Sequence, residues 1–390
     1  MERRLRLRPS WSLFTLYRQK HLFGRHLRGS GSMNDELQAR LVKVKRWLKS
    51  VEFSDWLFSN DPDTQAFCRS RIAKLASSDW LERKLCGELG DRTWRAPYRL
   101  LLVISETDPL GTLEGFLAAY LIGSRIRIKA RGSLPLLEAL RQALDLSESE
   151  CEIADWQSQS QDDARLLDGV DVVLLAGGDS LIRHYRAVAP AHVRLVELGP
   201  KLSAMAILGD ALPPVSHILT DVCLFLQGVC SSPRFIVVEK QRMAERLFDE
   251  LASRLDALPR LPDDVRLGQL AKAKVLYFQS LLSGGMFKVS YSEASGWGVT
   301  LSGELSPDIW LPTGISIVYG DVGRHLEQAH DRWFGQLQTL GYWGTESALR
   351  YGGFTRYCPV GKMHMRSATA PRDGVFTLAA LVTFIDEENE

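Results

Sequence analysis

Apolar residues in the first part of the chain recur at helical spacing. Over residues 33–97 they return every three or four positions, as at Leu37, Leu41, Val44 and Leu48, and that period is typical of amphipathic helices. No residues with candidate chemistry stand out here. We therefore expect a helical lead-in that packs against a following sheet domain.

From residue 98 the pattern changes to short apolar runs that alternate with helical segments. Five runs are expected to form strands: Tyr98–Ser105, Arg125–Lys129, Glu152–Ala154, Asp171–Leu175 and Val193–Glu197. Strands that alternate with helices predict a doubly wound parallel sheet, and such sheets bind nucleotides at the carboxyl ends of their strands. Residues 98–214 are therefore predicted to form a Rossmann-like, cofactor-binding domain.

A second α/β unit is predicted over residues 215–365. Strands are expected at Arg234–Glu239 and Ile315–Tyr319. The helices expected around them are Val215–Gln227, Gln241–Leu255, Leu267–Leu282 and Val322–Leu337. Residues 366–390 follow, and their apolar run from Gly374 to Ile385 predicts a C-terminal strand.

The net charge of +1 averages two unlike parts. The 390 residues include 48 basic and 47 acidic side chains. Residues 1–32 hold eight of the basic and one of the acidic ones, so this tail carries +7 and the rest of the chain −6. An acidic body argues against nucleic-acid binding, which needs a cationic face. The Arg-rich tail is formally similar to a transit peptide, and we expect it to lie outside the fold, as an extension, a mis-set start or a surface-binding segment.

The cysteines indicate a reducing compartment. Six occur in the chain, without a CxxC pair or a Cys/His cluster, so neither a disulfide framework nor a zinc site is predicted. The eight histidines are scattered, and no metal is assigned. No run of 18 apolar residues is present, which argues against a membrane span. A cytoplasmic protein is expected.

The sharpest candidate for chemistry is Cys230, in the segment Phe225–Arg234. Gly228 is suited to end the preceding helix and Pro233 prevents its continuation, so Cys230 falls in a constrained turn before a strand. Backbone N–H groups in such a turn favour a thiolate and an incoming oxyanion. The alternative is a buried cysteine in packing, which the local sequence alone favours.

Two places in the first unit suit a dinucleotide. Gly177 and Gly178 follow a strand and precede a helix that begins near Ser180, and this geometry can cradle a phosphate, although a plain tight turn explains it equally well. The strand over residues 125–129 ends in basic residues, where NAD enzymes place an acid, which favours NADPH over NADH. These basic residues are Arg125, Arg127, Lys129 and Arg131. The alternative is a solvated charged face.

Glu197 lies at the end of the fifth predicted strand, before Leu198 and Gly199. A carboxylate at that strand end can face the crevice and act as a base. The alternative, an exposed cap or an ion pair, is favoured by the local sequence.

Taken in order, four segments resemble the landmarks of the aldehyde dehydrogenase superfamily. They are Thr107-Asp108-Pro109, Gly123 to Lys129, Glu197-Leu198-Gly199 and Gln227 to Cys230. Within that superfamily the chain looks most like the acyl-CoA reductase family that supplies long-chain aldehyde to bacterial luciferase. This likeness covers about residues 35–388 and is carried by Asp221, Gln227–Pro233, Arg356–Met363 and Asp373-Gly374.

The resemblance implies two doubly wound α/β domains, one for the cofactor and one for catalysis, and a cysteine thioester mechanism. Cys230 would attack a long-chain acyl-CoA or another acyl thioester, and NADPH would reduce the acyl-enzyme to the aldehyde. The turn at Thr107 and Asp108 would help to hold the oxyanion, although the superfamily usually has Asn there and an Asp donates only when protonated. Glu197 matches the general base of hydrolytic members, which a thioester reductase does not need.

The resemblance also implies partners. A homo-oligomer is expected through the C-terminal strand near Val375–Phe384, and an acyl-transferring enzyme is a further expected partner. Two alternatives remain open. One is oxidation of an aldehyde with NAD(P)⁺, and the other is a partner-binding subunit that kept the fold and lost activity.

Overall fold

The computed structural model describes residues 35–50, 61–103, 108–130, 134–155, 163–344 and 353–386. The basic tail of residues 1–32, Thr107 and Arg131 lie outside the described residues. The predictions made for them therefore stay predictions.

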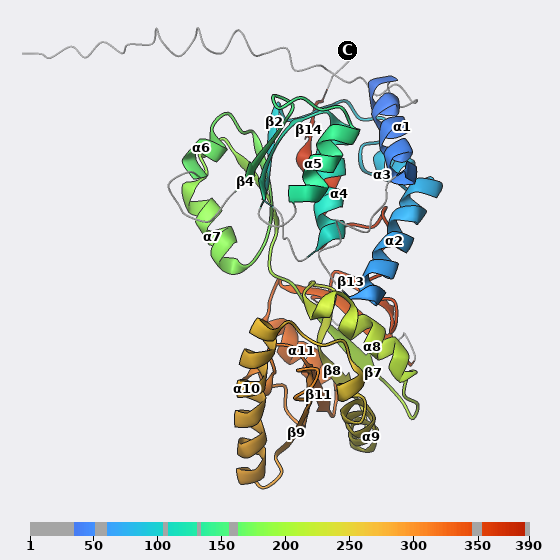
Figure 1. Ribbon diagram of the computed structural model, residues 1–390, viewed down its shortest axis with the longest axis vertical. Helices are drawn as coiled ribbons and strands as arrows, with labels where there is room; N and C mark the ends of the chain where they lie inside the picture. Colours follow the sequence, from blue (N-terminus) through green and yellow to red (C-terminus); the bar gives the residue numbers. More distant parts are fainter. Residues whose placement is uncertain are drawn as a thin grey trace, which may run out of the picture.

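The first sheet has five parallel strands in the order β4-β3-β2-β5-β6. Their bounds are β2 (Arg99–Val103), β3 (Arg125–Ala130), β4 (Cys151–Asp155), β5 (Val172–Ala176) and β6 (Arg194–Leu198). One face is covered by α4 (Pro109–Ile122) and α5 (Leu134–Ala143), the other by α6 (Asp163–Leu167) and α7 (Asp179–Val188). This is the doubly wound sheet predicted for this part of the chain (Figure 1).

Three N-terminal helices pack on the α4 side of this sheet. They are α1 (Asp35–Ser50), α2 (Pro62–Ser77) and α3 (Trp80–Glu88). Their apolar faces share one core with α4, in which Leu41, Trp47 and Phe116 are buried. Figure 1 shows α2 descending toward the second sheet, and its Thr64 hydroxyl accepts a hydrogen bond of 2.8 Å from the backbone N–H of Phe225. The lead-in therefore reaches the junction between the two sheets.

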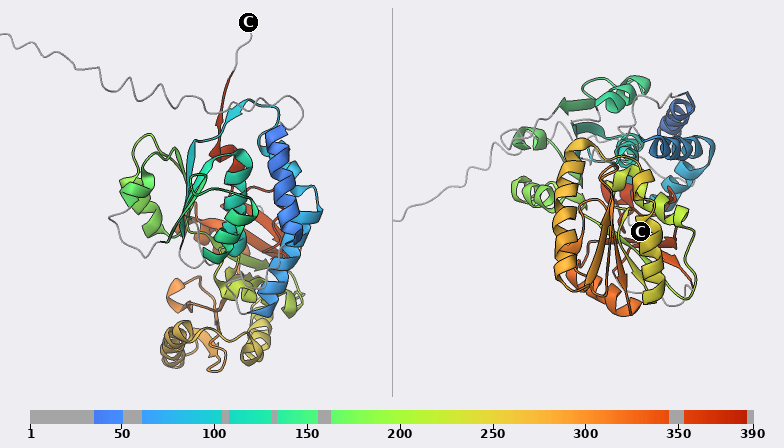
Figure 2. Two further views of the ribbon diagram at one scale, coloured as in Figure 1. Left: turned by 45° about the horizontal axis from the view of Figure 1, so that its top comes forward. Right: turned by 60° about the horizontal axis from the view of Figure 1, so that its bottom comes forward.

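The second sheet has seven strands in the order β13-β12-β7-β8-β11-β10-β9, all parallel except for β9. Their bounds are β7 (Leu202–Ile207), β8 (Pro233–Val238), β9 (Phe287–Tyr291), β10 (Gly298–Ser302), β11 (Ile315–Tyr319), β12 (Leu337–Trp343) and β13 (Arg356–Pro359). Helices α8 (Val215–Cys223) and α9 (Gln241–Ala252) cover one face and α11 (Val322–Arg332) covers the other. Helix α10 (Asp263–Leu282) packs along β9 at the edge (Figure 2).

The second sheet differs from the sequence prediction in several places, since only β8 and β11 of its seven strands were predicted. Strand β7 was not predicted, and it pairs with β8 and β12 although its residues were assigned to the first unit. The predicted helix from Val215 ends at Cys223, because the chain turns left-handed at Phe225. The predicted helix from Val322 ends at Arg332 instead of Leu337, and Leu337 begins a strand.

The C-terminal segment is mostly not a strand. Residues Thr377–Leu381 form helix α12, and a two-residue strand, β14 (Thr383–Phe384), pairs antiparallel with β1 (Trp94–Arg95) of the same chain. Glu88, which is buried, accepts hydrogen bonds from Leu378 N and Ala379 N at the start of α12. The C-terminal segment therefore packs against its own chain, on the side of the first sheet. Among the described residues, no helix is long and apolar enough to cross a membrane.

Candidate active site

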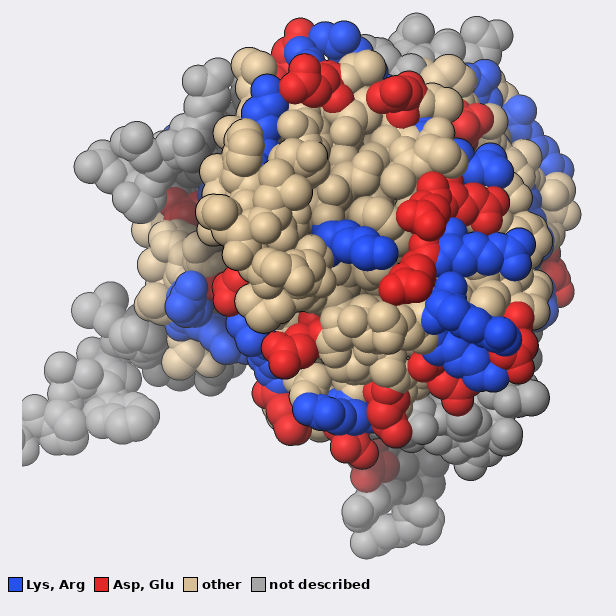
Figure 3. Space-filling model, turned by 90° about the horizontal axis from the view of Figure 1, so that it is seen from below, with Lys and Arg blue, Asp and Glu red and all other residues tan. Residues whose placement is uncertain are grey.

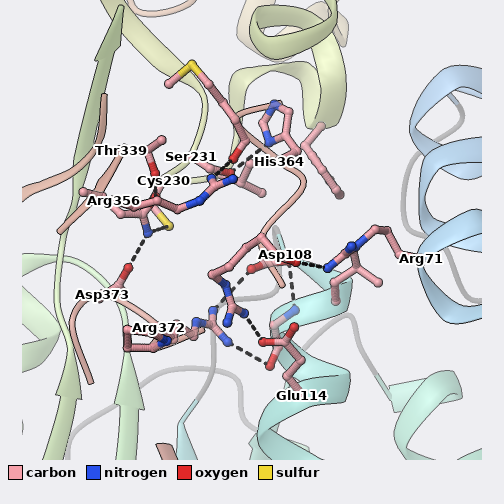
Figure 4. Close-up of a pocket in the computed structure, with 18 of the residues that line it drawn as sticks. Arg71, Asp108, Glu114, Cys230, Ser231, Thr339, Arg356, His364, Arg372 and Asp373 are labelled. Atoms are coloured by element: carbon pink, nitrogen blue, oxygen red, sulfur yellow. Dashed lines mark hydrogen bonds and ion pairs between the residues drawn. The ribbon is translucent and has the colours of Figure 1, made fainter. Parts of the chain in front are cut away.

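Cys230 lies where two cavities meet, in the loop between the 3-10 turn η1 (Leu224–Gln227) and β8. One cavity, here called the glycine cavity, is bordered by Gly177, Gly178 and residues 198–202. The other, here called the arginine cavity, is lined by Arg71, Arg356, Arg366 and Arg372 (Figure 4). A thiol at this border can contact ligands in both.

The turn before Cys230 has an unusual backbone. Phe225, Leu226 and Gln227 have φ values of 59°, 48° and 60°, a left-handed conformation that costs about 1–2 kcal/mol per residue outside glycine. The buried amide of Gln227 holds it in place. Its Nε2 donates to Pro233 O and Gly314 O, and its Oε1 accepts from Gly314 N, each at 2.8 Å. The conformation of the loop is thus imposed by the strands beside it.

Ser203 of β7 anchors the other end of the loop. Its fully buried hydroxyl donates to Cys230 O at 2.7 Å and accepts from Thr339 N at 3.2 Å. The β7 ladder shifts register at this level against both neighbours, β8 and β12, so these backbone groups lack ordinary ladder partners. The Ser203 side chain supplies the missing hydrogen bonds.

Gln338 of β12 is the side chain that contacts the Cys230 sulfur. Its Nε2 donates to Sγ at 2.9 Å and to the Asp373 carboxylate. Burial, followed by the Asp373 and Asp108 carboxylates, raises the pKa of the Cys230 thiol to about 11, although Arg372 and the Gln338 hydrogen bond act in the opposite direction. The resting thiol is therefore protonated at neutral pH, and the amide is already directed at the position of a developing charge.

Ser231, the residue after Cys230, forms a hydrogen bond with His364. His364 Nε2 lies 2.8 Å from the backbone oxygen of Asp221, so that nitrogen carries the proton, and Ser231 Oγ then donates to Nδ1 at 2.9 Å. Burial lowers the pKa of His364 to about 4. The imidazole is therefore neutral, and it fixes the orientation of the residue next to Cys230.

The glycine cavity lies where the sequence predicted the diphosphate of a dinucleotide. Gly177 and Gly178 line it, Gly178 is the N-cap of α7 without a side-chain cap, and a Cβ added there would meet nothing within 4 Å. The positive end of α7 is therefore beside the cavity, but its first turn carries the acidic Asp179, and Ser180 does not line the cavity. The strand register places Leu175, just before this turn, level with Val103 at the carboxyl end of the sheet.

The predicted basic cluster on β3 is mostly used inside the fold. Arg127 is buried and donates to Glu152 Oε2 at 2.7 Å and to the backbone oxygens of Arg165, Leu166 and Asp168. These contacts indicate a structural role for Arg127 and do not support a role in cofactor binding.

Lys129 lies at the carboxyl end of β3, where a cofactor ribose was predicted. Its Nζ forms an ion pair of 3.0 Å with the buried carboxylate of Asp163. That carboxylate also contacts His184 and Tyr185. The lysine is thus near the predicted place but already has an internal partner, and it borders neither cavity.

Glu197 is not brought to Cys230. Its carboxylate forms a two-point ion pair with Arg186 of α7, with Nε to Oε1 at 2.6 Å. Neither cavity at Cys230 is lined by Glu197. Side chains alternate between the faces of a strand, and this one lies on the α7 face. The ion pair that the local sequence favoured is the arrangement present.

Asp108 does lie beside Cys230, and it borders both cavities. It caps α4, with Oδ1 accepting from Gly111 N at 2.9 Å, and Oδ2 forms an ion pair of 3.3 Å with Arg372. A Cβ on Gly111 would come within 2.5 Å of that carboxylate, so glycine permits this close approach. With both oxygens accepting, Asp108 is an acceptor and not the oxyanion donor that its position first indicated.

Some residues of the site could not be found from a local motif. Gln338 carries no sequence signal, and Asp373 stood out only as part of the family resemblance. The lead-in helix was expected to offer no chemistry, yet it contributes Phe67, Arg71 and Leu75 to the arginine cavity. Their spacing of four residues places them on one face of α2, and that spacing is the signal that could have revealed them.

Comparisons with known proteins identify relatives in sequence and in structure. Residues 142–384 match the family model described as Acyl-CoA reductase (LuxC). A curated relative, the long-chain acyl-protein thioester reductase 2 of Photobacterium leiognathi, is 25% identical over 256 residues, which are 60% of this chain and 51% of that protein. The chain thus spans about half the length of this relative.

Solved structures of aldehyde dehydrogenases share the fold. Aldehyde dehydrogenase 21 from Physcomitrella patens has a TM-score of 0.66 at 12% identity, covering 90% of this chain and 85% of that one. Lactaldehyde dehydrogenase from Escherichia coli has a TM-score of 0.65 at 14% identity, with coverage of 90% and 85%. The 1-pyrroline-5-carboxylate dehydrogenase from Thermus, with bound NAD, reaches 0.66 at 11% identity, with coverage of 90% and 80%. The predicted aldehyde-dehydrogenase-like fold is confirmed.

Proposed function

Because the chain belongs to the acyl-CoA reductase (LuxC) family, we propose that it reduces an acyl thioester to an aldehyde through an acyl-Cys230 intermediate. The acyl carrier is CoA or a protein thioester, as in the name of the relative from Photobacterium leiognathi. The observation that carries the proposal is the position of Cys230 at the border of two cavities. One cavity offers a phosphate cradle, and the other offers space for the acyl group.

The cofactor in this proposal is a nicotinamide dinucleotide, which supplies a hydride when bound. Gly177, Gly178 and the first turn of α7 would hold its diphosphate in the glycine cavity. NADPH is the predicted form, and among the described cations of β3, Lys129 is the one placed at the strand end that a 2′-phosphate approaches. Binding of that phosphate would compete with Asp163 for the Lys129 ammonium.

The first chemical step transfers the acyl group to Cys230. A bond forms between Sγ and the thioester carbon, the carbon–sulfur bond to the carrier breaks, and the proton of Cys230 ends on the leaving thiol. The Gln338 amide, 2.9 Å from Sγ, is the side-chain donor placed to hold the developing oxyanion. In this proposal the Gln338 amide holds the oxyanion, the role that the family resemblance implied for the turn at Thr107 and Asp108.

The second step adds a hydride to the acyl-enzyme carbonyl carbon and a proton from solvent to its oxygen, which gives a thiohemiacetal on Cys230. In its collapse the carbon–sulfur bond breaks, the carbonyl of the aldehyde forms, and the proton of the hemiacetal hydroxyl moves to the sulfur. A raised thiol pKa favours this transfer, because the protonated thiol is the stable resting form.

Oxidation of an aldehyde to an acid is the alternative, because the solved neighbours are aldehyde dehydrogenases. That reaction needs an activated water at the acyl-enzyme, and Glu197, the matching base, is paired with Arg186 and lies outside both cavities. The geometry therefore favours the reductive direction.

Mass spectrometry of the protein with a panel of acyl-CoA thioesters, without reduced cofactor, tests the proposal. We expect one acyl group on Cys230, its release as aldehyde on addition of NADPH, and loss of both in Cys230→Ala. Cys86→Ala, which removes an exposed thiol, is the matched control and should behave as wild type. Acylation and aldehyde release that persist in Cys230→Ala would overturn the assignment.

A further inference from the structure

The arginine cavity contains more positive charge than its carboxylates neutralise. Four arginines line it, together with three carboxylates. Arg366 pairs with Glu114, and Arg372 pairs with Asp108. The third carboxylate, Asp373, contacts Gln338. Arg71 and Arg356 therefore form no direct ion pair among the residues that the structure describes, although Glu114 attracts Arg71 and Asp221 attracts Arg356 from farther away.

Arg71 is the more buried of these two. Only 9% of it is exposed, and its described hydrogen bond goes to the backbone oxygen of Arg366. Its guanidinium also lies over the Trp80 ring, 5.1 Å from the centroid. Arg356 likewise donates to backbone oxygens, those of Lys362 and Met363. A guanidinium has five N–H donors, and a buried charge is costly unless an anion pairs with it.

The position of these arginines relative to Cys230 indicates which molecule would carry the anion that pairs with them. Figure 4 shows Arg71 reaching from α2, and Arg356 beside Cys230, into the same space. The glycine cavity on the other side of the thiol suits the cofactor, so the acyl chain has to extend from the Cys230 sulfur into the arginine cavity. Apolar side chains in its wall, such as Phe67 and Leu113, suit the methylene groups in between.

We propose that the acyl group carries a carboxylate, which Arg71 binds together with Arg356. The preferred substrates are then half-thioesters of dicarboxylic acids, rather than unsubstituted fatty acyl thioesters. This inference rests on the proposed function, because it assumes that the acyl group is attached at Cys230. A phosphate on the pantetheine arm of the carrier is the other group that would supply this negative charge. The experiment therefore has to distinguish that phosphate from the acyl carboxylate.

The test compares the monothioesters of six- to ten-carbon dicarboxylic acids with uncharged acyl-CoA thioesters of the same length. For wild type we expect kcat/KM to favour the carboxylated substrate by at least about tenfold. Arg71→Met should remove that preference, and Arg71→Lys should restore part of it. Arg69→Met is the matched control, since Arg69 is exposed on the same helix and bonds Gln65.

N-acetylcysteamine thioesters, which lack phosphate, separate the two sources of the anion. If the acyl carboxylate is the ligand, Arg71→Met lowers kcat/KM equally for the carboxylated CoA and N-acetylcysteamine thioesters. If a phosphate of the carrier is the ligand, the variant weakens every CoA thioester and no N-acetylcysteamine thioester, and the proposal is wrong. A wild type that prefers uncharged acyl groups overturns it as well.

Thermal stabilisation by the free acids gives a readout that does not depend on turnover. Adipate should raise the melting temperature of wild type and of Arg69→Met, but not of Arg71→Met, and hexanoate should have no such effect. If no thioester of any kind is reduced, the proposed function fails, and this binding measurement still decides whether the arginine cavity takes a carboxylate. Equal responses to adipate in wild type and Arg71→Met would rule that out.

Discussion

The Cys230 thiol has to lose its proton before it can act, and its surroundings resist that loss. Burial is the largest cause of its pKa of about 11, and the Asp373 carboxylate is the next. Arg372 and Gln338 favour the thiolate. Groups beside the sulfur therefore shift the thiol pKa in opposite directions. A substitution that removes one of these charges should shift the pKa in the direction that the charge predicts.

Asp373→Asn should make Cys230 more reactive toward iodoacetamide. Removal of the carboxylate removes a negative charge that disfavours the thiolate, while an Asn oxygen can still accept from Gln338. The midpoint of the alkylation profile should move to lower pH, and the rate at pH 8 should rise by up to about tenfold, the factor of one pKa unit. Alkylation is followed by peptide mass spectrometry in a Cys86→Ala background. A profile that is unchanged or moves upward would contradict the assignment.

Gln338→Met should lower kcat for thioester reduction by about 10²–10³, the usual cost of one lost oxyanion donor. The substitution keeps the side-chain length but removes the amide that lies 2.9 Å from Sγ. Single-turnover kinetics with a saturating acyl thioester measure this effect. Glu197→Gln is the control and should retain near-normal reduction, because Glu197 lies outside both cavities. Full activity of Gln338→Met would show that another donor holds the oxyanion.

Some of these residues could be located from the sequence, and others could not, for a physical reason. Gly228 and Pro233 drew attention to Cys230, but the local sequence favoured a packing role, and only the family resemblance made it the predicted nucleophile. Glu197 was correctly placed near a strand end, but only the packed structure shows that its side chain pairs with Arg186. Gln338 could not be found, because it reaches Cys230 across 108 residues and no local pattern specifies that contact.

At the scale of elements, the turn η1 depends on one buried amide. Gln227 satisfies backbone groups of Pro233 and Gly314 while its own φ is 60°. Gln227→Leu would leave these groups without partners, and each buried unsatisfied group costs about 1–3 kcal/mol. We expect the free energy of unfolding to fall by at least about 2 kcal/mol, as measured by denaturant titration.

Gln241→Leu is a suitable control for this change. Gln241 begins α9, where it is exposed and contacts only Glu245 among its described hydrogen-bond partners. The control should change the free energy of unfolding by less than about 0.5 kcal/mol. Similar stabilities of the two variants would mean that the left-handed turn does not need its amide.

Elements were predictable where burial is regular along the chain. All five strands of the first sheet were predicted: β2 and β5 are nearly continuous buried apolar runs, whereas β3 alternates apolar with basic residues, and β4 and β6 are mixed. Strand β12 was not predicted, and its first residue, Leu337, was assigned to the preceding helix because it continues the apolar spacing of α11. The C-terminal run was read as a strand because short apolar runs do not distinguish a buried helix from a strand.

At the scale of the whole molecule, a broad apolar face remains uncovered. Helix α10 exposes a stripe at helical spacing that includes Leu267, Val275, Phe278 and Leu282, which are between 53% and 88% exposed. Figure 3 shows the view from below, the end where α10 lies, with a wide area free of charged side chains. A homo-oligomer was predicted through the C-terminal strand, but β14 pairs within its own chain.

Helix α10 is therefore a further candidate for self-association, beside the predicted C-terminal strand. One helix stripe can pack against its own copy around a twofold axis, because each side chain then meets an equivalent partner. Phe278→Glu should convert a dimer to a monomer in light scattering, while Val42→Glu, at an exposed site on α1, should leave the dimer intact. A Phe278→Glu protein with the wild-type mass would place the interface elsewhere.

The ion pair between Arg372 and Asp108 joins residues 264 positions apart. Translation proceeds from the N-terminus, so Cys230 emerges from the ribosome long before Arg372 and Asp373 exist to surround it. The nucleophile therefore acquires these partners only after all strands of the second sheet have been synthesised, and a shorter nascent chain holds an unfinished site. A stop codon at position 371 would delete neither Cys230 nor a strand of the two main sheets, yet it would leave the arginine cavity open on one side.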